Sequence, residues 1–245
     1  MIMIDLARYG LEESVGLHII ISNFFWWLSI ILVFIAYGYR RLWSVGDMPW
    51  AFLFLTFICF AIRELGHLSG SPLIGTIRYI FGVWSAIFMA SAFISLYLKI
   101  CQRKKDSMAM TYTPFILVIL FPVIVLYLYI SGTDVSDLKK ITGNIESLVW
   151  MAASSLIIYA TYMLGTRTTG GFIRVFMFFQ FSAFTAFTWK LLGLIESLGS
   201  PIPYSIREII ETLFGLFAIV SMYLLMRMLR KLSRYMHSEK YGHKS

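Results

Sequence analysis

Long apolar runs separated by short polar segments dominate the chain, and within the runs polar and apolar residues do not alternate. A helix needs about 20 mostly apolar residues to cross a bilayer. Lipid cannot satisfy backbone polar groups, so spans are helices or closed barrels, and continuous runs favour helices. The pattern therefore predicts an all-α integral membrane protein with seven transmembrane helices, over residues 17–39, 49–69, 76–98, 112–131, 144–164, 172–195 and 204–228.

Composition agrees with a membrane location. Of the 245 residues, 59% are hydrophobic and only 14% are charged, whereas soluble domains carry about 25% charged residues. The net charge of +8 does not indicate nucleic acid binding, because the basic residues gather between and after the spans, where membrane topology places them. We expect a multi-pass protein of the plasma membrane, without a removable signal peptide at its N-terminus.

The distribution of lysine and arginine predicts the orientation. Basic residues follow the first span (Arg40, Arg41), follow the third span (residues 99–105), flank the connection after the fifth, and follow the seventh. Short cytoplasmic segments carry such an excess, so the N-terminus is expected outside and the C-terminus inside. Residues 229–245 then form a basic cytoplasmic tail that contacts anionic lipid or, together with the basic loops, a cytoplasmic or membrane protein partner.

One stretch of the sequence occurs twice in similar form. The stretch SPLIGTIRYI begins at Ser71, and SPIPYSIREI begins at Ser200, so that Arg78 corresponds to Arg207. Four spans separate the two copies, which gives both the same orientation. We therefore predict one domain, residues 1–245, in which a three-helix repeat (17–98) and its parallel copy (144–228) are joined by a linker helix (112–131).

This 3+1+3 plan resembles, in architecture, the microbial rhodopsins and the SWEET sugar transporters. The residues do not place the chain in either family. The seventh span, residues 204–228, lacks the lysine that holds retinal, and the chain has no Pro-Gln pair of the kind SWEET transporters carry. The resemblance implies a fold and no function.

Charged residues gather at the outer ends of several spans. Ionisable groups within a membrane normally face the bundle interior and pair with one another. Two interpretations follow: arginine clamps that join neighbouring helices, or an outward-facing polar pocket for a small ligand. The predicted ligand-binding residues are Arg63, Glu64, His67, Arg78, Lys190, Glu196, Arg207, Glu208 and Glu211.

Few residues suggest catalysis, a metal or a cofactor. His18 and His67 open and close adjacent spans at the same side, so a metal or haem b held by these two histidines is a weak alternative to a site without either. Motifs of metalloproteases, phosphate loops and serine hydrolases do not occur. We therefore do not expect an enzyme.

Three function classes remain open. The first is a receptor or sensor that binds a small polar ligand in the outer pocket. The second is a small-solute transporter whose site lies between the repeats. The third is a haem-binding or structural subunit of a membrane redox complex. Transport by alternating access needs a polar site near the midplane, whereas the charges here lie toward the outside, which favours the receptor-like interpretation.

Overall fold

The computed structural model describes residues 15–42, 45–68, 70–103 and 108–242, and these residues form helices and no strands. Six helices are long and apolar enough to cross a membrane, and α1 contributes the shorter apolar helix Asn23–Tyr37. The chain is thus all-helical and suited to a multi-pass membrane protein. The α-helices are α1 (Val15–Tyr37), α2 (Met48–Leu65), α3 (Pro72–Ile100), α4 (Met108–Ile130), α5 (Val135–Arg167), α6 (Gly171–Ser197) and α7 (Tyr204–Gly242).

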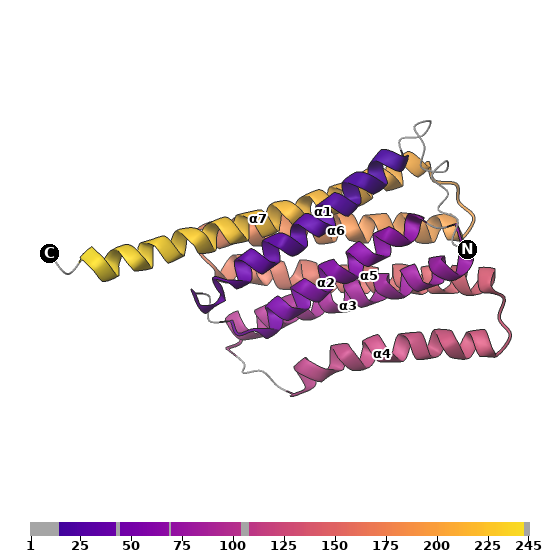
Figure 1. Ribbon diagram of the computed structural model, residues 1–245, viewed down its shortest axis with the longest axis horizontal. Coiled ribbons are helices and arrows are strands. Elements are labelled where there is room, and N and C mark those ends of the chain that lie inside the picture. The colour runs from indigo at the N-terminus through magenta and orange to yellow at the C-terminus, as the bar shows by residue number, and fades with distance from the viewer. Residues whose placement is uncertain (1–14, 43–44, 69, 104–107, 243–245) are drawn as a thin grey trace.

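Two helices, α5 and α7, extend well beyond the spans that the sequence pattern predicted. Helix α5 starts at Val135, well before the predicted position 144. Its start is set by Asp134, whose carboxylate accepts hydrogen bonds from the Ser136 hydroxyl and, at 2.9 Å, from the Ser136 backbone N–H. The bond from the hydroxyl and then that from the backbone lower the pKa of Asp134 below its ordinary value. Helix α7 continues from the predicted end at 228 to Gly242 and extends past the other helices (Figure 1).

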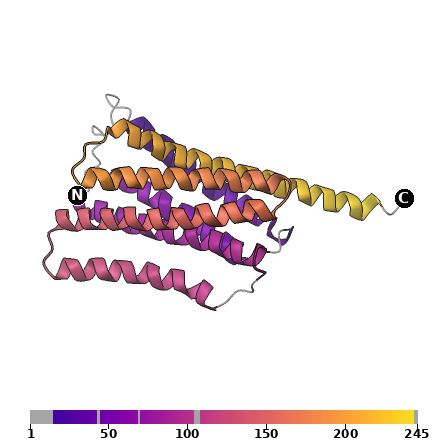
Figure 2. The same ribbon diagram turned by 180° about the vertical axis from the view of Figure 1, so that it is seen from behind.

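Six of the helices form a closed ring. Around it, α1 packs on α2, α2 on α3, α3 on α5, α5 on α6, α6 on α7, and α7 again on α1. Helix α4 lies outside the ring, mainly against α3, as the views from both sides show (Figures 1 and 2). At one end of the ring α2 and α6 finish while α3, α5 and α7 begin; we call this the charged end.

The outer surface is strongly apolar. Large hydrophobic side chains are exposed on α1, including Phe34, and along most of α4, including Ile119 and Tyr127. Soluble monomers rarely expose contiguous apolar surface on this scale. Lipid contact explains it, and α4 has the smallest buried share of the candidate spans.

Large aromatic side chains fill the centre of the ring. Trp26, Phe60, Trp150, Trp189 and Phe214 come from α1, α2, α5, α6 and α7 and are all buried. The Phe60 ring lies 4.1 Å from Trp26 and 5.4 Å from Phe214, centroid to centroid. We call these five residues the aromatic layer. It leaves the middle of the bundle packed with rings.

This packing predicts a large cost for removing one ring. Phe214 is fully buried and contacts the other four members of the aromatic layer. Phe214→Ala is expected to lower the free energy of unfolding by about 3–5 kcal/mol, measured in mixed micelles. Phe184 on α6 is 60% exposed, so Phe184→Ala should change it by no more than about 0.5 kcal/mol. Equal effects would contradict the proposed role of the layer.

Candidate ligand-binding site

A buried glutamate joins two cations of opposite helices. Glu146 on α5 accepts a hydrogen bond from Arg63 Nε of α2 at 2.7 Å through Oε1, and one from Lys190 Nζ of α6 at 2.5 Å through Oε2. All three side chains are no more than 5% exposed. Each carboxylate oxygen of Glu146 therefore has its own cation, and the three charges tie α2, α5 and α6 together.

Two further carboxylates complete this group. Arg63 Nη1 donates to Glu64 Oε1 and lies 3.2 Å from Glu211 Oε1 of α7. Glu64 and Glu211 are also buried. We call Arg63, Glu64, Glu146, Lys190 and Glu211 the ion cluster; it joins four of the six helices in the ring.

The ion cluster lies directly on the aromatic layer. The Arg63 guanidinium carbon is 5.1 Å from the centre of the Phe60 ring and 4.8 Å from that of Trp189. Lys190 Nζ lies 3.8 Å from the centre of the Trp189 ring. Ring faces attract cations when water is excluded. The two cations are therefore held by carboxylates and by ring faces.

A glycine on α3 makes room for the central carboxylate. A Cβ atom at Gly82 would lie 2.0 Å from Glu146 Oε1. Only a residue without a side chain lets α3 approach α5 this closely at the Glu146 carboxylate. Gly143 on α5 likewise makes room for the Tyr79 ring of α3. A Cβ atom added at Gly143 would lie 3.0 Å from this ring.

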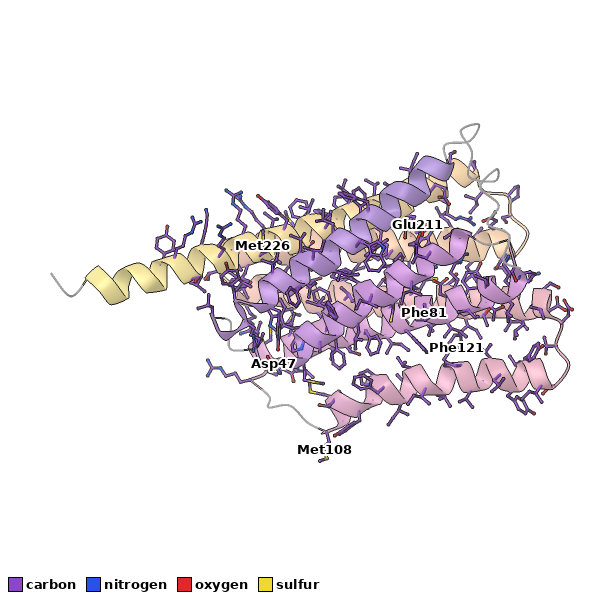
Figure 3. The ribbon with its side chains drawn as sticks, viewed as in Figure 1. Asp47, Phe81, Met108, Phe121, Glu211 and Met226 are labelled. Carbon is purple, nitrogen blue, oxygen red and sulfur yellow. The ribbon has the colours of Figure 1, made fainter. Side chains whose placement is uncertain are left out.

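A cavity of about 400 Å³ lies over the ion cluster at the charged end, within the usual range for small-molecule sites. Figure 3 shows Glu211 toward this end of α7 and Met226 farther toward the other. Charged side chains from α3, α5, α6 and α7 surround it, with the open space beside Gly193. The lining includes Arg63, His67, Arg78, Tyr79, Lys139, Lys140, Asn144, Glu146, Trp189, Lys190, Gly193, Glu196, Arg207, Glu208 and Glu211.

Two arginines border the cavity with different partners. Arg207 of α7 donates to Glu196 of α6 in a partly exposed ion pair. Arg78 of α3 donates from Nη1 to His67 Nδ1 at 2.8 Å, and its guanidinium carbon lies 4.7 Å from the centre of the Tyr79 ring. Both arginines therefore join neighbouring helical segments, as the clamp interpretation expects, and both also line the cavity.

The structure brings the predicted residues together. Of the nine, all but Glu64 line the cavity, and Glu64 lies behind it on Arg63. That these residues bind a ligand stays a prediction. The predicted site omitted Glu146, Lys139 and Lys140, which line the cavity. The two lysines fall in the predicted loop before the fifth span and Glu146 at the very start of that span (144–164), whereas the structure places all three on α5.

A signal for Glu146 was present in the sequence. Thr142, Glu146 and Trp150 follow one another at four-residue spacing and continue into Ala153 and Ile157, all on the buried face of α5. A helix drawn with a period of 3.6 from Asp134 onward places Glu146 on this face.

One described histidine, His67, lies beside two buried carboxylates. Ligand atoms of Glu64, His67 and Glu211 lie within 4.8 Å of one another. However, both carboxylates bond Arg63, and His67 Nδ1 accepts from Arg78, which has only donors. In neutral His67 the proton therefore sits on Nε2, so metal binding through Nε2 would require displacing it. The side chain of His18, the other residue of the metal or haem alternative, lies outside the described residues.

Comparison with protein-family models, curated proteins and solved structures found no match. The class of the protein therefore rests on fold and site together. The chain is a helical, multi-pass membrane protein with a buried ion cluster beneath a polar cavity at one end.

The ion cluster predicts that Glu146 is essential for stability. Glu146→Ala leaves Arg63 and Lys190 buried without their shared carboxylate, and the free energy of unfolding should fall by about 3–5 kcal/mol. Glu196→Ala removes a partly exposed pair and should cost no more than about 1 kcal/mol. The measurement is unfolding in mixed micelles. A cost near 1 kcal/mol for Glu146→Ala would show that the cluster does not hold the helices together.

The close approach at Gly82 generates a second prediction. Gly82→Ala forces the Glu146 carboxylate away from its cations, and overpacking alone costs about 1–3 kcal/mol. Gly165 on the same helix as Glu146 has no atom within 4 Å of an added Cβ, so Gly165→Ala should be neutral or stabilising. In a double-mutant cycle the cost of Gly82→Ala should largely vanish in a Glu146→Ala background. Additive costs would contradict this contact.

Proposed function

We propose that the protein is a receptor- or sensor-like membrane protein that binds a small polar ligand in the cavity at the charged end. The supporting observation is the cavity itself: a polar space whose lining is already fixed by ion pairs and whose base is the ion cluster. Preorganised lining groups reduce the entropy cost of binding. In this proposal the protein crosses the plasma membrane seven times, with the charged end outside and the C-terminus in the cytoplasm.

The internal repeat is part of this proposal. When Ser71 is aligned with Ser200, α1, α2 and α3 correspond to α5, α6 and α7. The contact of α3 with α5 then corresponds to that of α7 with α1, and these two contacts close the ring. A parallel duplication with α4 as linker accounts for both closures and for the position of α4 outside the ring.

Two features support a receptor over a transporter. A transported solute must pass from the cavity to the opposite end, and the path along the ring axis is filled by Trp26, Phe60, Trp150, Trp189 and Phe214, each no more than 4% exposed. Passage would also require opening the ion cluster. A ligand that only perturbs this cluster needs neither change.

Helix α7 offers a route for a signal. It carries Glu211 at the cavity and continues without interruption to Gly242, about 46 Å away at a rise of 1.5 Å per residue. A shift of α7 at the cavity therefore reaches the basic tail at the opposite end. In the proposal, this tail and the basic loops contact a cytoplasmic or membrane partner.

Cysteine labelling tests the cavity and its side of the membrane. In a Cys59→Ala/Cys101→Ala background, Gly193→Cys places a thiol in the open part of the cavity. A membrane-impermeant thiol reagent added outside intact cells is expected to label it, since the cavity opens to the outside. Gly165→Cys on α5, nearer the opposite end, is the control and should stay unlabelled. Labelling of Gly193→Cys only after cell lysis would contradict the proposed orientation.

Filling the cavity tests binding. A panel of small polar solutes is screened for an increase in the thermal midpoint of the purified protein; a ligand at 100 times its Kd stabilises by about 2.7 kcal/mol. Gly193→Phe should abolish the increase, while Gly165→Phe should preserve it. If a solute from this screen exchanges across the membrane of proteoliposomes in a counterflow assay, the transporter alternative is supported. If no solute changes the thermal midpoint of the unmodified protein or of Gly165→Phe, ligand binding is contradicted. A Soret band in the purified protein would support the haem alternative.

A further inference from the structure

We propose that the ligand of this cavity carries an anionic oxygen group, a carboxylate or a phosphate, which is bound by Arg78 together with Lys139 and Lys140. The inference rests on the proposed function, because it names the chemistry that the same cavity recognises. The cavity lining holds six basic side chains, Arg63, Arg78, Lys139, Lys140, Lys190 and Arg207, and their partners differ.

Half of these cations are already held by carboxylates. Arg63 contacts Glu64, Glu146 and Glu211, Lys190 contacts Glu146, and Arg207 contacts Glu196. A ligand anion at these three would compete with a carboxylate that the fold already supplies. They are therefore poor anion sites despite their charge.

Arg78 differs from them. Within the described part of the chain it has no carboxylate partner: its Nη1 donates to the imidazole of His67, and its buried Nε has no hydrogen-bond partner. A buried N–H without an acceptor carries a desolvation cost. A carboxylate or phosphate binds a guanidinium through two parallel N–H bonds, so an anion is suited to satisfy Nε.

The surroundings also fix the position of Arg78. An added Cβ at Gly66 would lie 2.8 Å from Arg78 Cβ and 2.9 Å from its Cγ, so the glycine lets the arginine stem lie against the end of α2. The guanidinium then meets His67 on one side and the Tyr79 ring on the other. An arginine held in this way loses little side-chain entropy on binding.

The sequence repeat contains an internal comparison. In the alignment of Ser71 with Ser200, Arg78 corresponds to Arg207, and His67 corresponds to Glu196. The two arginines contact the residues at these equivalent positions. One half pairs the arginine with a carboxylate and the other with an imidazole, so that of these two arginines Arg78 is the one without a carboxylate partner.

Two lysines of α5 add to this charge. Lys139 and Lys140 line the cavity, and neither has an ion-pair partner among the described residues. The Lys139 stem crosses α3 at Gly75, where an added Cβ would lie 2.8 Å from its Cε. Three cations without carboxylates thus come from α3 and α5, on the side of the cavity where these helices pack together.

Binding measurements on the full chain in nanodiscs of neutral phosphatidylcholine test the inference. The probes are succinate and inorganic phosphate, with uncharged succinamide and dicationic 1,4-diaminobutane as controls. We expect at least one anion to bind and both controls to bind at least about tenfold more weakly, because charge-assisted hydrogen bonds are stronger than neutral ones. Arg78→Gln should weaken binding of the anion by about tenfold or more. Arg207→Gln should weaken it by less than about threefold.

His67→Glu is the sharpest variant. It gives Arg78 the carboxylate partner that Arg207 has and leaves every lysine and arginine in place, so it should weaken anion binding as much as Arg78→Gln does. Because the new carboxylate also lies beside Glu64 and Glu211, the unliganded thermal midpoint of His67→Glu is measured in parallel to establish that the variant is folded. The inference is overturned if His67→Glu binds the anion as tightly as the unmodified chain does. It is also overturned if Arg78→Gln and Arg207→Gln lose the same amount of affinity for the anion.

A final arm separates the sources of the anion. Nanodiscs containing phosphatidylglycerol should raise the midpoint of the unmodified chain more than that of Arg78→Gln if a lipid headgroup is the ligand; a soluble solute predicts no such difference. If no anion binds from either source while a neutral or cationic solute binds and is lost in Gly193→Phe, the inference fails and the proposed function stands. If Gly193→Phe changes the binding of no solute, the proposed function fails as well.

Discussion

The structure depends on the double hydrogen bond that Glu146 accepts from Arg63 and Lys190. Separating charges from water in a bundle surrounded by hydrocarbon is costly, and only a complete set of partners offsets the cost. The chain supplies that set from α2, α5, α6 and α7, and places the cations over the aromatic layer. Because each of these helices holds a member of the cluster, the cluster fixes how the helices are rotated and shifted against one another, and so fixes the cavity lining.

The space around the cluster depends on differences between the two halves of the chain. In the same alignment of the two halves, Glu64 corresponds to Gly193 and Glu211 to Gly82. Each of these two acids of the cluster thus has a glycine at the equivalent position. Gly82 gives room to Glu146, and Gly193 leaves open space in the cavity. An acid at all four positions would crowd the site with uncompensated negative charge, whereas the observed set leaves the cavity open beside Gly193.

The helical membrane architecture could be read from the sequence because continuous apolar runs are set by bilayer thickness, which acts on every span alike. The sequence also predicted that the nine residues come together, because ionisable groups near span ends are rare and must converge. Glu146 was missed for a physical reason. Asp134 caps α5 well before the apolar run begins, so that the first turns of α5 are assigned to a loop, and Glu146 then stands at the edge of the predicted span rather than on the buried face of a longer helix. The partners of Arg63 and Arg78 depend on helix rotation, which hydropathy does not encode.

The arrangement separates the cations that hold the bundle together from those to which we assign ligand recognition. Arg63 and Lys190 are buried and held by carboxylates, so their charge is used in stabilising the helix packing. Arg78, Lys139 and Lys140 lie at the border between α3 and α5, and none of them takes part in the ion pairs of the cluster. A ligand there is nevertheless close to the cluster, because Gly82 brings α3 against the Glu146 carboxylate. Any change in the spacing of α3 and α5 upon binding must therefore alter the contact on which α2, α6 and α7 depend, and this links recognition at the border to the packing of the whole ring.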